Sequence, residues 1–215
     1  MVGIERIRFM TSHPKDASIE LFKAVKGLDK VCEHLHLPMQ SGSDRILKLM
    51  NRKYTAAKYL KLIEGYRKIV PAGSLTTDVV VGFPTETEKD FNKTAKLLGK
   101  IGFDSAFTFK YSPRPPAKAA KLEDDVSKEI KDRRLKILMD MQTKISERRN
   151  KALEGSVVEV LVDGQNRKEP ELLTGRTRSN KVAIFKGNKR LIGRFVNVRI
   201  VSVTPYALKG KLYNA

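Results

Sequence analysis

The fold class is indicated by one stretch of the chain, LTTDVVVGFPTETEKDF, which covers residues 75–91. Its first half is a short run rich in valine and threonine, which is typical of a buried strand. Gly82 and Pro84 then predict a turn. Thr87, with Asp90 three residues later, predicts the start of a helix with an imperfect capping box. The stretch therefore predicts a strand, a turn and a helix in immediate succession.

The same alternation of strand and helix extends from the N-terminus to about residue 154. Apolar runs that predict strands cover 6–10, 31–37, 75–81 and 103–110. Segments with helical spacing of apolar residues lie between these runs. This order indicates parallel strands joined by crossover helices. Four strands are too few to close a (β/α)₈ barrel, so we expect an open sheet or a partial barrel.

A longer helix is predicted over 127–153, with Gly155 as its stop. Its expected buried stripe consists of five apolar residues: Ile130, Leu135, Leu138, Met141 and Ile145. After this helix the pattern changes to short runs with turn residues between them. The expected strands are 156–163, 172–178, 181–186, 195–203 and 207–213. Five short strands favour a small all-β barrel of the OB type. We therefore predict two domains, over residues 1–154 and 155–215.

The charge balance indicates a polyanionic partner. The chain of 215 residues has 43 Lys and Arg against 24 Asp and Glu, a formal net charge of +19. Basic side chains that neutralise phosphates release condensed counterions, so such a surplus favours nucleic acid. The alternative is a basic surface that serves only solubility. The second domain has few aromatic residues, which favours contacts with phosphates over stacking on bases.

The sequence contains one cysteine, Cys32, which excludes a disulfide framework or a cluster of thiolates within this chain. His34 and His36 would share one face of a strand, but no third metal ligand is evident, so hydrogen-bonded histidines are favoured over a metal site. No membrane span or signal peptide is recognisable, and a cytoplasmic location is expected.

Polar residues cluster at the ends of the predicted parallel strands, where ligands of such folds bind. Gln40, Ser41 and Ser43 can hydrogen-bond a ribose or an amino-acid head group, and Gly42 would let a ligand approach the backbone. Capping of the next helix, by Ser43 or Asp44, is the alternative. For the run 82–87, ligand binding and a plain strand–helix junction are equally compatible with the sequence.

The proline-rich loop after the fourth predicted strand presents Arg114 and Lys118. A stiff loop with basic side chains suits a phosphate group, and a rigid connector is the alternative.

Several of these runs occur in the order and at the separations found in the methylthiotransferase family of radical S-adenosylmethionine enzymes. They are RIRFMTSHP (6–14), LHLPMQSGSD (35–44), LMNRKYT (49–55), GFPTET (82–87) and YSPR (111–114). The run GRTRSN (175–180) resembles the terminal TRAM module of the MiaB-type branch. That branch methylthiolates N6-isopentenyladenosine next to the tRNA anticodon. The similarity extends over essentially the whole chain.

The resemblance implies S-adenosylmethionine as a cofactor. The residues implied at this site are Gln40, Ser41, Arg52, Asp78, Val81, Gly82 and Pro84. Gln40 and Ser41 would lie near the ribose and methionine parts, and Arg52 would pair with the carboxylate. Val81, Gly82 and Pro84 would lie on the adenine side of the cofactor, and Asp78 would support their strand.

The resemblance and the charge together predict tRNA as a partner. The expected RNA-binding residues are all basic: Arg114, Arg176, Arg178, Lys181, Lys186 and Arg190. The first lies on the proline-rich loop, and the others lie in the second domain.

The chain departs from the family in one respect that bears on activity. The family's Cys-x-x-x-Cys-x-x-Cys site and its N-terminal domain are missing, and one cysteine cannot hold a [4Fe–4S] cluster. We therefore expect this chain to supply part of the cofactor site and the tRNA-binding module, to need the missing N-terminal part as a partner, and to be inactive alone. Two alternatives stay open: a stand-alone RNA-binding protein, or a methylthiotransferase for another tRNA base or a ribosomal protein.

Overall fold

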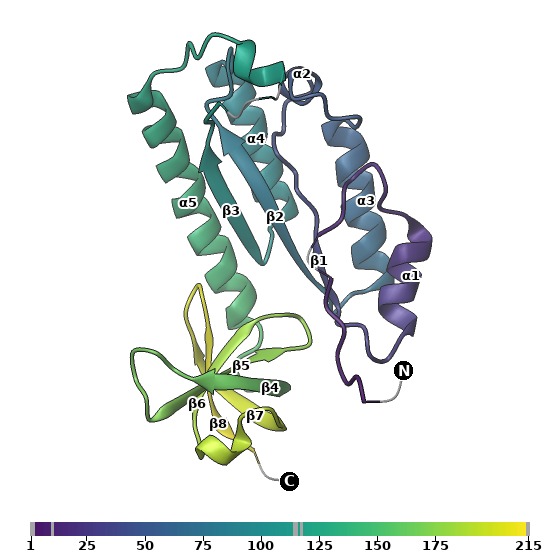
Figure 1. The fold of residues 1–215 in the computed structure, drawn as a ribbon, viewed down its shortest axis with the longest axis vertical. Helices are drawn as coiled ribbons and strands as arrows, with labels where there is room; N and C mark the ends of the chain where they lie inside the picture. The colour runs from purple at the N-terminus through teal and green to yellow at the C-terminus, as the bar shows by residue number, and fades with distance from the viewer. Residues whose placement is uncertain (1–2, 10, 114–115, 117, 214–215) are drawn as a thin grey trace.

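Three parallel strands form the sheet of the N-terminal part, in the order β1-β2-β3. They are β1 (His34–His36), β2 (Ser74–Val81) and β3 (Ser105–Lys110). The structure is a computed structural model that describes residues 3–9, 11–113, 116 and 118–213. The helices are α1 (Ile19–Gly27), α2 (Asp44–Leu49), α3 (Ala56–Ile69), α4 (Glu88–Ile101) and α5 (Lys128–Lys151), with a 3₁₀ turn, η1, at Lys118–Lys121. Figure 1 shows α4 behind the sheet and α5 alongside β3.

The core of this part lies between the sheet and its helices. Leu35, Leu75 and Val79 point from the strands into a cluster that includes Tyr59 of α3 and Phe91 of α4, and all five side chains are buried. Helix α4 begins at the predicted capping box, because the Thr87 and Asp90 side chains each accept a hydrogen bond from the other's backbone N–H. The expected partial barrel of parallel strands is confirmed.

The strand predicted over 6–10 is reduced to one parallel bridge between Ile7 and Val31. The side chains beside Ile7 point to the second domain. Nη1 of Arg6 donates to the Arg176 carbonyl, and Nη2 of Arg8 donates to the Thr177 carbonyl, each at 2.8 Å. These contacts draw the segment toward the second domain, and a longer parallel ladder does not form among the described residues.

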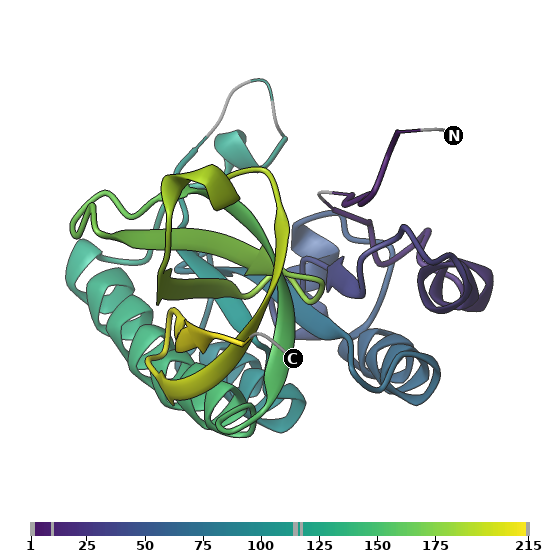
Figure 2. The same cartoon turned by 90° about the horizontal axis from the view of Figure 1, so that it is seen from below.

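The second domain is a closed barrel in the order β4-β5-β6-β8-β7. Its strands are β4 (Val157–Gln165), β5 (Leu172–Thr177), β6 (Val182–Lys186), β7 (Phe195–Val203) and β8 (Leu208–Leu212), with a 3₁₀ turn, η2, at Lys189–Leu191. All five predicted β runs are confirmed within two residues. Gly210 is required for closure, because a Cβ there would lie 2.6 Å from the Arg199 carbonyl oxygen. The barrel lies below the sheet in Figure 1 and in front of it in Figure 2.

The buried stripe predicted for α5 is only partly correct. Leu138 and Ile145 are buried, but Ile130 is 37% exposed. The other buried positions of α5 are polar: Lys131, Arg134, Gln142, Ser146 and Asn150. Their partners are carboxylates and carbonyl groups of loops and of the barrel, so apolar periodicity could not identify this face of the helix.

One hairpin of the barrel makes most of the side-chain contacts with the sheet domain. We call residues 176–181, between β5 and β6, the docking hairpin. The Arg178 guanidinium binds the Glu33 carboxylate through two hydrogen bonds of 2.8 and 2.9 Å and also donates to the Val31 carbonyl. Nζ of Lys181 lies 2.6 Å from Oδ1 of Asp104.

Asp104 is the point at which the sheet, α5 and the barrel meet. Its carboxylate accepts the Leu75 backbone N–H, and both Lys181 and Arg149 of α5 form ion pairs with it. Burial alone would raise the pKa of Asp104, but the charges of Lys181 and Arg149 outweigh burial and hold that pKa below its ordinary value.

The other face of the sheet opens to a cleft of about 1070 Å³ between the sheet and the barrel. His34, His36 and Thr76 lie on this face, and both histidines are hydrogen-bonded to the Thr76 hydroxyl, at 3.0 and 2.9 Å. Phe107 and Phe109 of β3 also line the cleft and are about half exposed.

We expect His34 to make stability depend on pH. Burial, followed by the nearby His36, lowers the pKa of His34 from 6.5 to about 4. Between these values the unfolded chain binds a proton at this residue and the folded chain does not, so the free energy of unfolding should fall as pH decreases, by up to about 3 kcal/mol. Urea unfolding at pH 7 and pH 5 measures this. His34→Gln should show a smaller difference between the two pH values; an unchanged difference would contradict the assignment.

We expect Lys181→Ala to destabilise the chain by about 2–3 kcal/mol, because it leaves the buried Asp104 carboxylate with one cationic partner fewer. Lys186→Ala is the matched control. Lys186 is exposed in the same barrel without an ion pair among the described residues, and its replacement should change stability by less than about 0.5 kcal/mol. Equal unfolding midpoints in urea for the two variants would show that the Asp104 contact does not stabilise the fold.

Candidate cofactor and RNA-binding sites

The polar run after β1 begins with a residue in an unusual conformation. Gln40 has φ 63°, in the left-handed region, where a residue other than glycine is strained. Two backbone hydrogen bonds hold it there. Its N–H donates to the Asp78 carbonyl at 2.8 Å, and its carbonyl accepts from the Val80 N–H at 2.9 Å. Strain that the surroundings enforce in this way is a feature of binding sites.

Helix α4 fixes the rest of this run. Ser41 is fully buried, and its hydroxyl lies 3.2 Å from the Thr94 hydroxyl, which also accepts the Gly42 N–H at 2.9 Å. A Cβ at Gly42 would lie 2.6 Å from the Thr94 Cα. Gly42 is therefore required for close packing of the loop on α4, whereas the sequence suggested close approach of a ligand.

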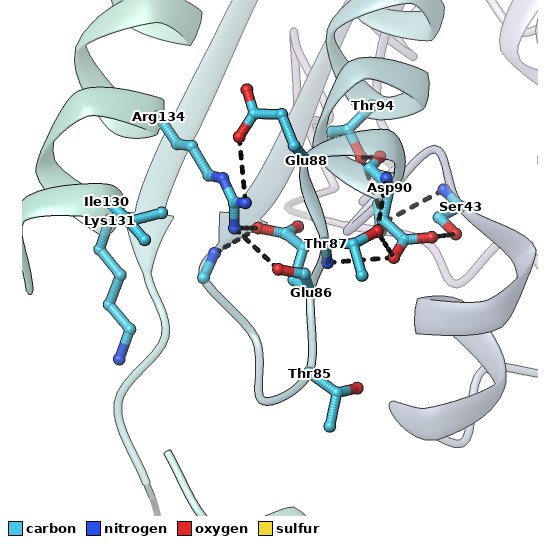
Figure 3. A network of polar contacts seen from close by, with 12 residues as sticks. Ser43, Thr85, Glu86, Thr87, Glu88, Asp90, Thr94, Ile130, Lys131 and Arg134 are labelled. Carbon is cyan, nitrogen blue, oxygen red and sulfur yellow. Dashed lines mark hydrogen bonds and ion pairs between the residues drawn. The ribbon is translucent and has the colours of Figure 1, made fainter. Parts of the chain in front are cut away.

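Asp90 joins the loops that follow β1 and β2 (Figure 3). Its carboxylate accepts hydrogen bonds from the Ser43 hydroxyl and from Arg45, both at 2.6 Å, and from the N–H and hydroxyl of Thr87. Burial alone would raise the pKa of Asp90, but the bonds from Arg45, Ser43 and Thr87 outweigh burial and hold that pKa below its ordinary value. The two loops are thus held together by one ionised side chain.

The loop at Gly82 is held from α5. Gly82 has φ 67°, and its N–H donates to the Glu86 carboxylate at 2.7 Å. Arg134 of α5 binds the same carboxylate at 2.9 Å and the Glu86 carbonyl at 3.0 Å (Figure 3). A Cβ at Gly82 would lie 2.3 Å from the Lys131 side chain. Burial raises the pKa of Glu86, and its bonds from Gly82 and Arg134 oppose that shift.

Two of the seven expected cofactor residues meet at one pocket. Gln40 and Asp78 line a cavity of about 420 Å³ at the C-terminal edge of the sheet, together with Val80, Lys110 and Tyr111. The amide, carboxylate and ammonium groups suit a ligand that carries both polar and charged groups. Oδ2 of Asp78 also lies 3.3 Å from Nε2 of His36.

The other five expected cofactor residues do not line this cavity. The hydroxyl of Ser41 is already bonded to α4, and the side chain of Val81 packs into the core. Gly82 and Pro84 are buried in the loop after β2. Arg52 is half-buried, with Nη1 3.3 Å from Nε2 of His13.

The residues of this chain do not suit a [4Fe–4S] cluster. Such a cluster is held by several thiolates, and the only cysteine of the sequence, Cys32, is 1% exposed in the structure. The described residues contain no group of three His, Cys, Asp or Glu side chains that could hold a metal ion.

The expected RNA-binding residues lie in different surroundings. Arg178 and Lys181 form ion pairs with the sheet domain, and Arg176 lies 3.8 Å from Asp163. Lys186 and Arg190 are exposed, without an ion pair in the described part of the chain. Arg114 lies outside the described residues.

Sequence reasoning missed the residues that hold these loops and the docking hairpin. They are Glu33, Glu86, Asp90, Asp104, Arg134 and Asn150. Of these residues, only Asp90 could be identified from the sequence, as part of the capping box.

Among the helices of the described ranges, none is both long and apolar enough to cross a membrane.

Two family descriptions match the chain. The Radical SAM superfamily matches residues 2–98, and the TRAM domain matches residues 151–213. Among solved structures, the radical SAM enzyme coproporphyrinogen III oxidase (HemN) from Escherichia coli is similar, with a TM-score of 0.55 and 15% identity over 80% of this chain and 46% of that chain. This likeness supports the fold alone.

Curated relatives are considerably more similar. The tRNA-2-methylthio-N(6)-dimethylallyladenosine synthase of Acetivibrio thermocellus is 51% identical over 210 residues, 98% of this chain and 44% of the relative. The protein of the same name from Syntrophomonas wolfei is 48% identical over 214 residues, 100% of this chain and 48% of the relative. The chain thus spans about half the length of the curated relatives it matches. Identity at this level over almost the whole chain makes it similar to these synthases along its length, with a region that matches the Radical SAM superfamily followed by one that matches the TRAM domain.

Proposed function

We propose that the chain is the C-terminal part of a tRNA methylthiotransferase that adds a methylthio group to N6-isopentenyladenosine next to the anticodon. The observation that carries this proposal is the identity of about half the residues with synthases of that name. The remainder of the protein would supply the cysteines of the [4Fe–4S] cluster. A domain boundary between residues 154 and 155 and a cytoplasmic location belong to the same proposal.

In this proposal the pocket at Gln40 and Asp78 is the part of the S-adenosylmethionine site that this chain contributes. Bound S-adenosylmethionine supplies the radical chemistry. The strained Gln40 would present its amide to the ribose or methionine, and Arg52 would pair with the carboxylate. Val81, Gly82 and Pro84 would contact the adenine side through their backbone, since their side chains are buried or absent.

The barrel and the proline-rich loop would bind tRNA. The proposed contacts remain Arg114, Arg176, Arg178, Lys181, Lys186 and Arg190. Of these, Lys186 and Arg190 are the best placed, because they are exposed and without an ion pair among the described residues. A stand-alone RNA-binding protein is the second candidate function, favoured by the single cysteine of this sequence.

We expect the chain alone to bind no stoichiometric [4Fe–4S] cluster, because one buried thiol cannot replace several thiolate ligands. Anaerobic incubation with iron and sulfide, followed by desalting and absorbance in the thiolate-to-iron charge-transfer band, measures this. A Cys32→Ala variant should give the same spectrum as the wild type. A stable cluster that Cys32→Ala abolishes would contradict the expectation.

We expect the chain to bind an anticodon stem-loop RNA through phosphates, and Lys186→Ala/Arg190→Ala to weaken this binding. Each lost phosphate contact should flatten the dependence of log Kd on log salt by roughly 0.7–0.9. Fluorescence anisotropy at several KCl concentrations measures both quantities. Absence of RNA binding by the wild type would contradict the proposed function, and an unchanged slope would exclude these two side chains as phosphate contacts.

A further inference from the structure

Two groups of basic residues in the barrel differ in their partners. Those of the docking hairpin already have partners within the chain, since Arg178 binds Glu33 and Lys181 binds Asp104. A second group lies on β7 and β8: Arg199, Lys209 and Lys211, all exposed. None of the three forms an ion pair in the part of the chain that the structure describes. This second group was not recognised from the sequence.

Strand pairing places two of these cations directly opposite each other. Arg199 of β7 is the register partner of Lys211 of β8 in their antiparallel pair. Like charges directly opposite each other on neighbouring strands repel and destabilise the sheet. On the other side of β7, the register partner of Arg199 is Val157, which offers no negative charge. Neither register partner of Arg199 is therefore an acidic residue.

No carboxylate from the last four strands can relieve this repulsion. From Leu172 to Ala215 the sequence contains ten Lys or Arg residues and no Asp or Glu. A uniformly basic stretch of this kind suits an external polyanion, because the repulsion between its cations is relieved when the anion binds.

An aromatic ring lies among these cations. Lys209, Lys211 and Tyr213 alternate along the chain, as residues on one face of a strand do. The Arg199 guanidinium carbon lies 4.5 Å from the centre of the Tyr213 ring, which is itself 37% exposed. Stacking on the ring orients the guanidinium and leaves its N–H groups free for a phosphate.

We infer that the outward face of β7 and β8 binds single-stranded RNA, with Arg199 and Lys211 on phosphates and Tyr213 against a base. The inference rests on the proposed function and specifies where the tRNA partner would contact the barrel. The aromatic ring distinguishes this face from a purely electrostatic one, because every base offers a face for stacking. The sequence alone had favoured phosphate contacts without stacking.

The test compares Arg199→Ala/Lys211→Ala with Lys61→Ala/Lys68→Ala. The control pair lies exposed on α3, has no ion pair in the described ranges and removes the same charge. A fluorescein-labelled anticodon stem-loop RNA is titrated at several KCl concentrations. The β7–β8 variant should bind about tenfold more weakly at low salt, with a slope of log Kd against log salt smaller by about 1.5, and the control should match the wild type.

Two single variants separate binding from folding. Lys211→Ala should weaken RNA binding while raising or preserving the urea unfolding midpoint, because it removes the repulsion with Arg199. Tyr213→Leu should weaken binding about fivefold or more without changing the salt slope, and Tyr213→Phe should restore binding.

The outcomes distinguish the inference from the proposed function. If the wild type binds no RNA, both are overturned. If the wild type binds RNA and the β7–β8 variant behaves as the control does, only the inference is overturned. Salt-dependent binding to phosphatidylserine vesicles that is tighter than binding to RNA would also overturn it, since the face would then serve a membrane surface.

Discussion

The position of the barrel depends on the ionised carboxylate of Asp104. This residue lies just before β3 and is 9% exposed. An ionised group so little exposed is stable only when hydrogen bonds and opposite charges replace water. The Leu75 N–H, Arg149 and Lys181 provide them from the sheet, from α5 and from the barrel. A displacement of any of the three elements would leave this charge uncompensated, so their relative positions are fixed together.

The polar face of α5 is explained by the same need of buried polar groups for partners. Near its C-terminal end, Asn150 accepts from Lys181 and donates to the Thr204 carbonyl of the barrel. Near its N-terminal end, Arg134 binds Glu86 in the loop after β2. One helix thus holds the barrel at one end and the candidate cofactor loop at the other. Because α5 is rigid, the distance between these two sites is set by its length.

The sequence could predict the elements that depend on local patterns. The five β runs of the barrel and the capping box at Thr87 follow from alternation, turn residues and short-range hydrogen bonding, and they were predicted correctly. The buried face of α5 was not, because its partners are carboxylates and carbonyls brought together by the tertiary fold. The strand expected over 6–10 also failed, since Arg6 and Arg8 bind barrel carbonyls far away in the sequence. Of the candidate cofactor residues, the position of Gln40 at the end of a strand followed from topology. Asp78 was expected only from the family resemblance, as a support for its strand, and the burial of Ser41 was not expected.

The net charge of +19 is a sum in which every basic residue counts alike. In the structure these residues differ, because some are paired with carboxylates and others are not. Arg178 and Lys181 lie opposite carboxylates and stabilise the contact between the domains, so their charges are already compensated. Arg199 and Lys211 lie opposite each other, and their repulsion reduces the stability of the barrel. Such a pair does not stabilise the sheet by itself. A bound phosphate backbone would neutralise both charges and so relieve their repulsion, which would favour binding. The signature run 175–180 is thus compatible with a structural role, and the proposed RNA-binding face lies on strands that carry no recognisable motif.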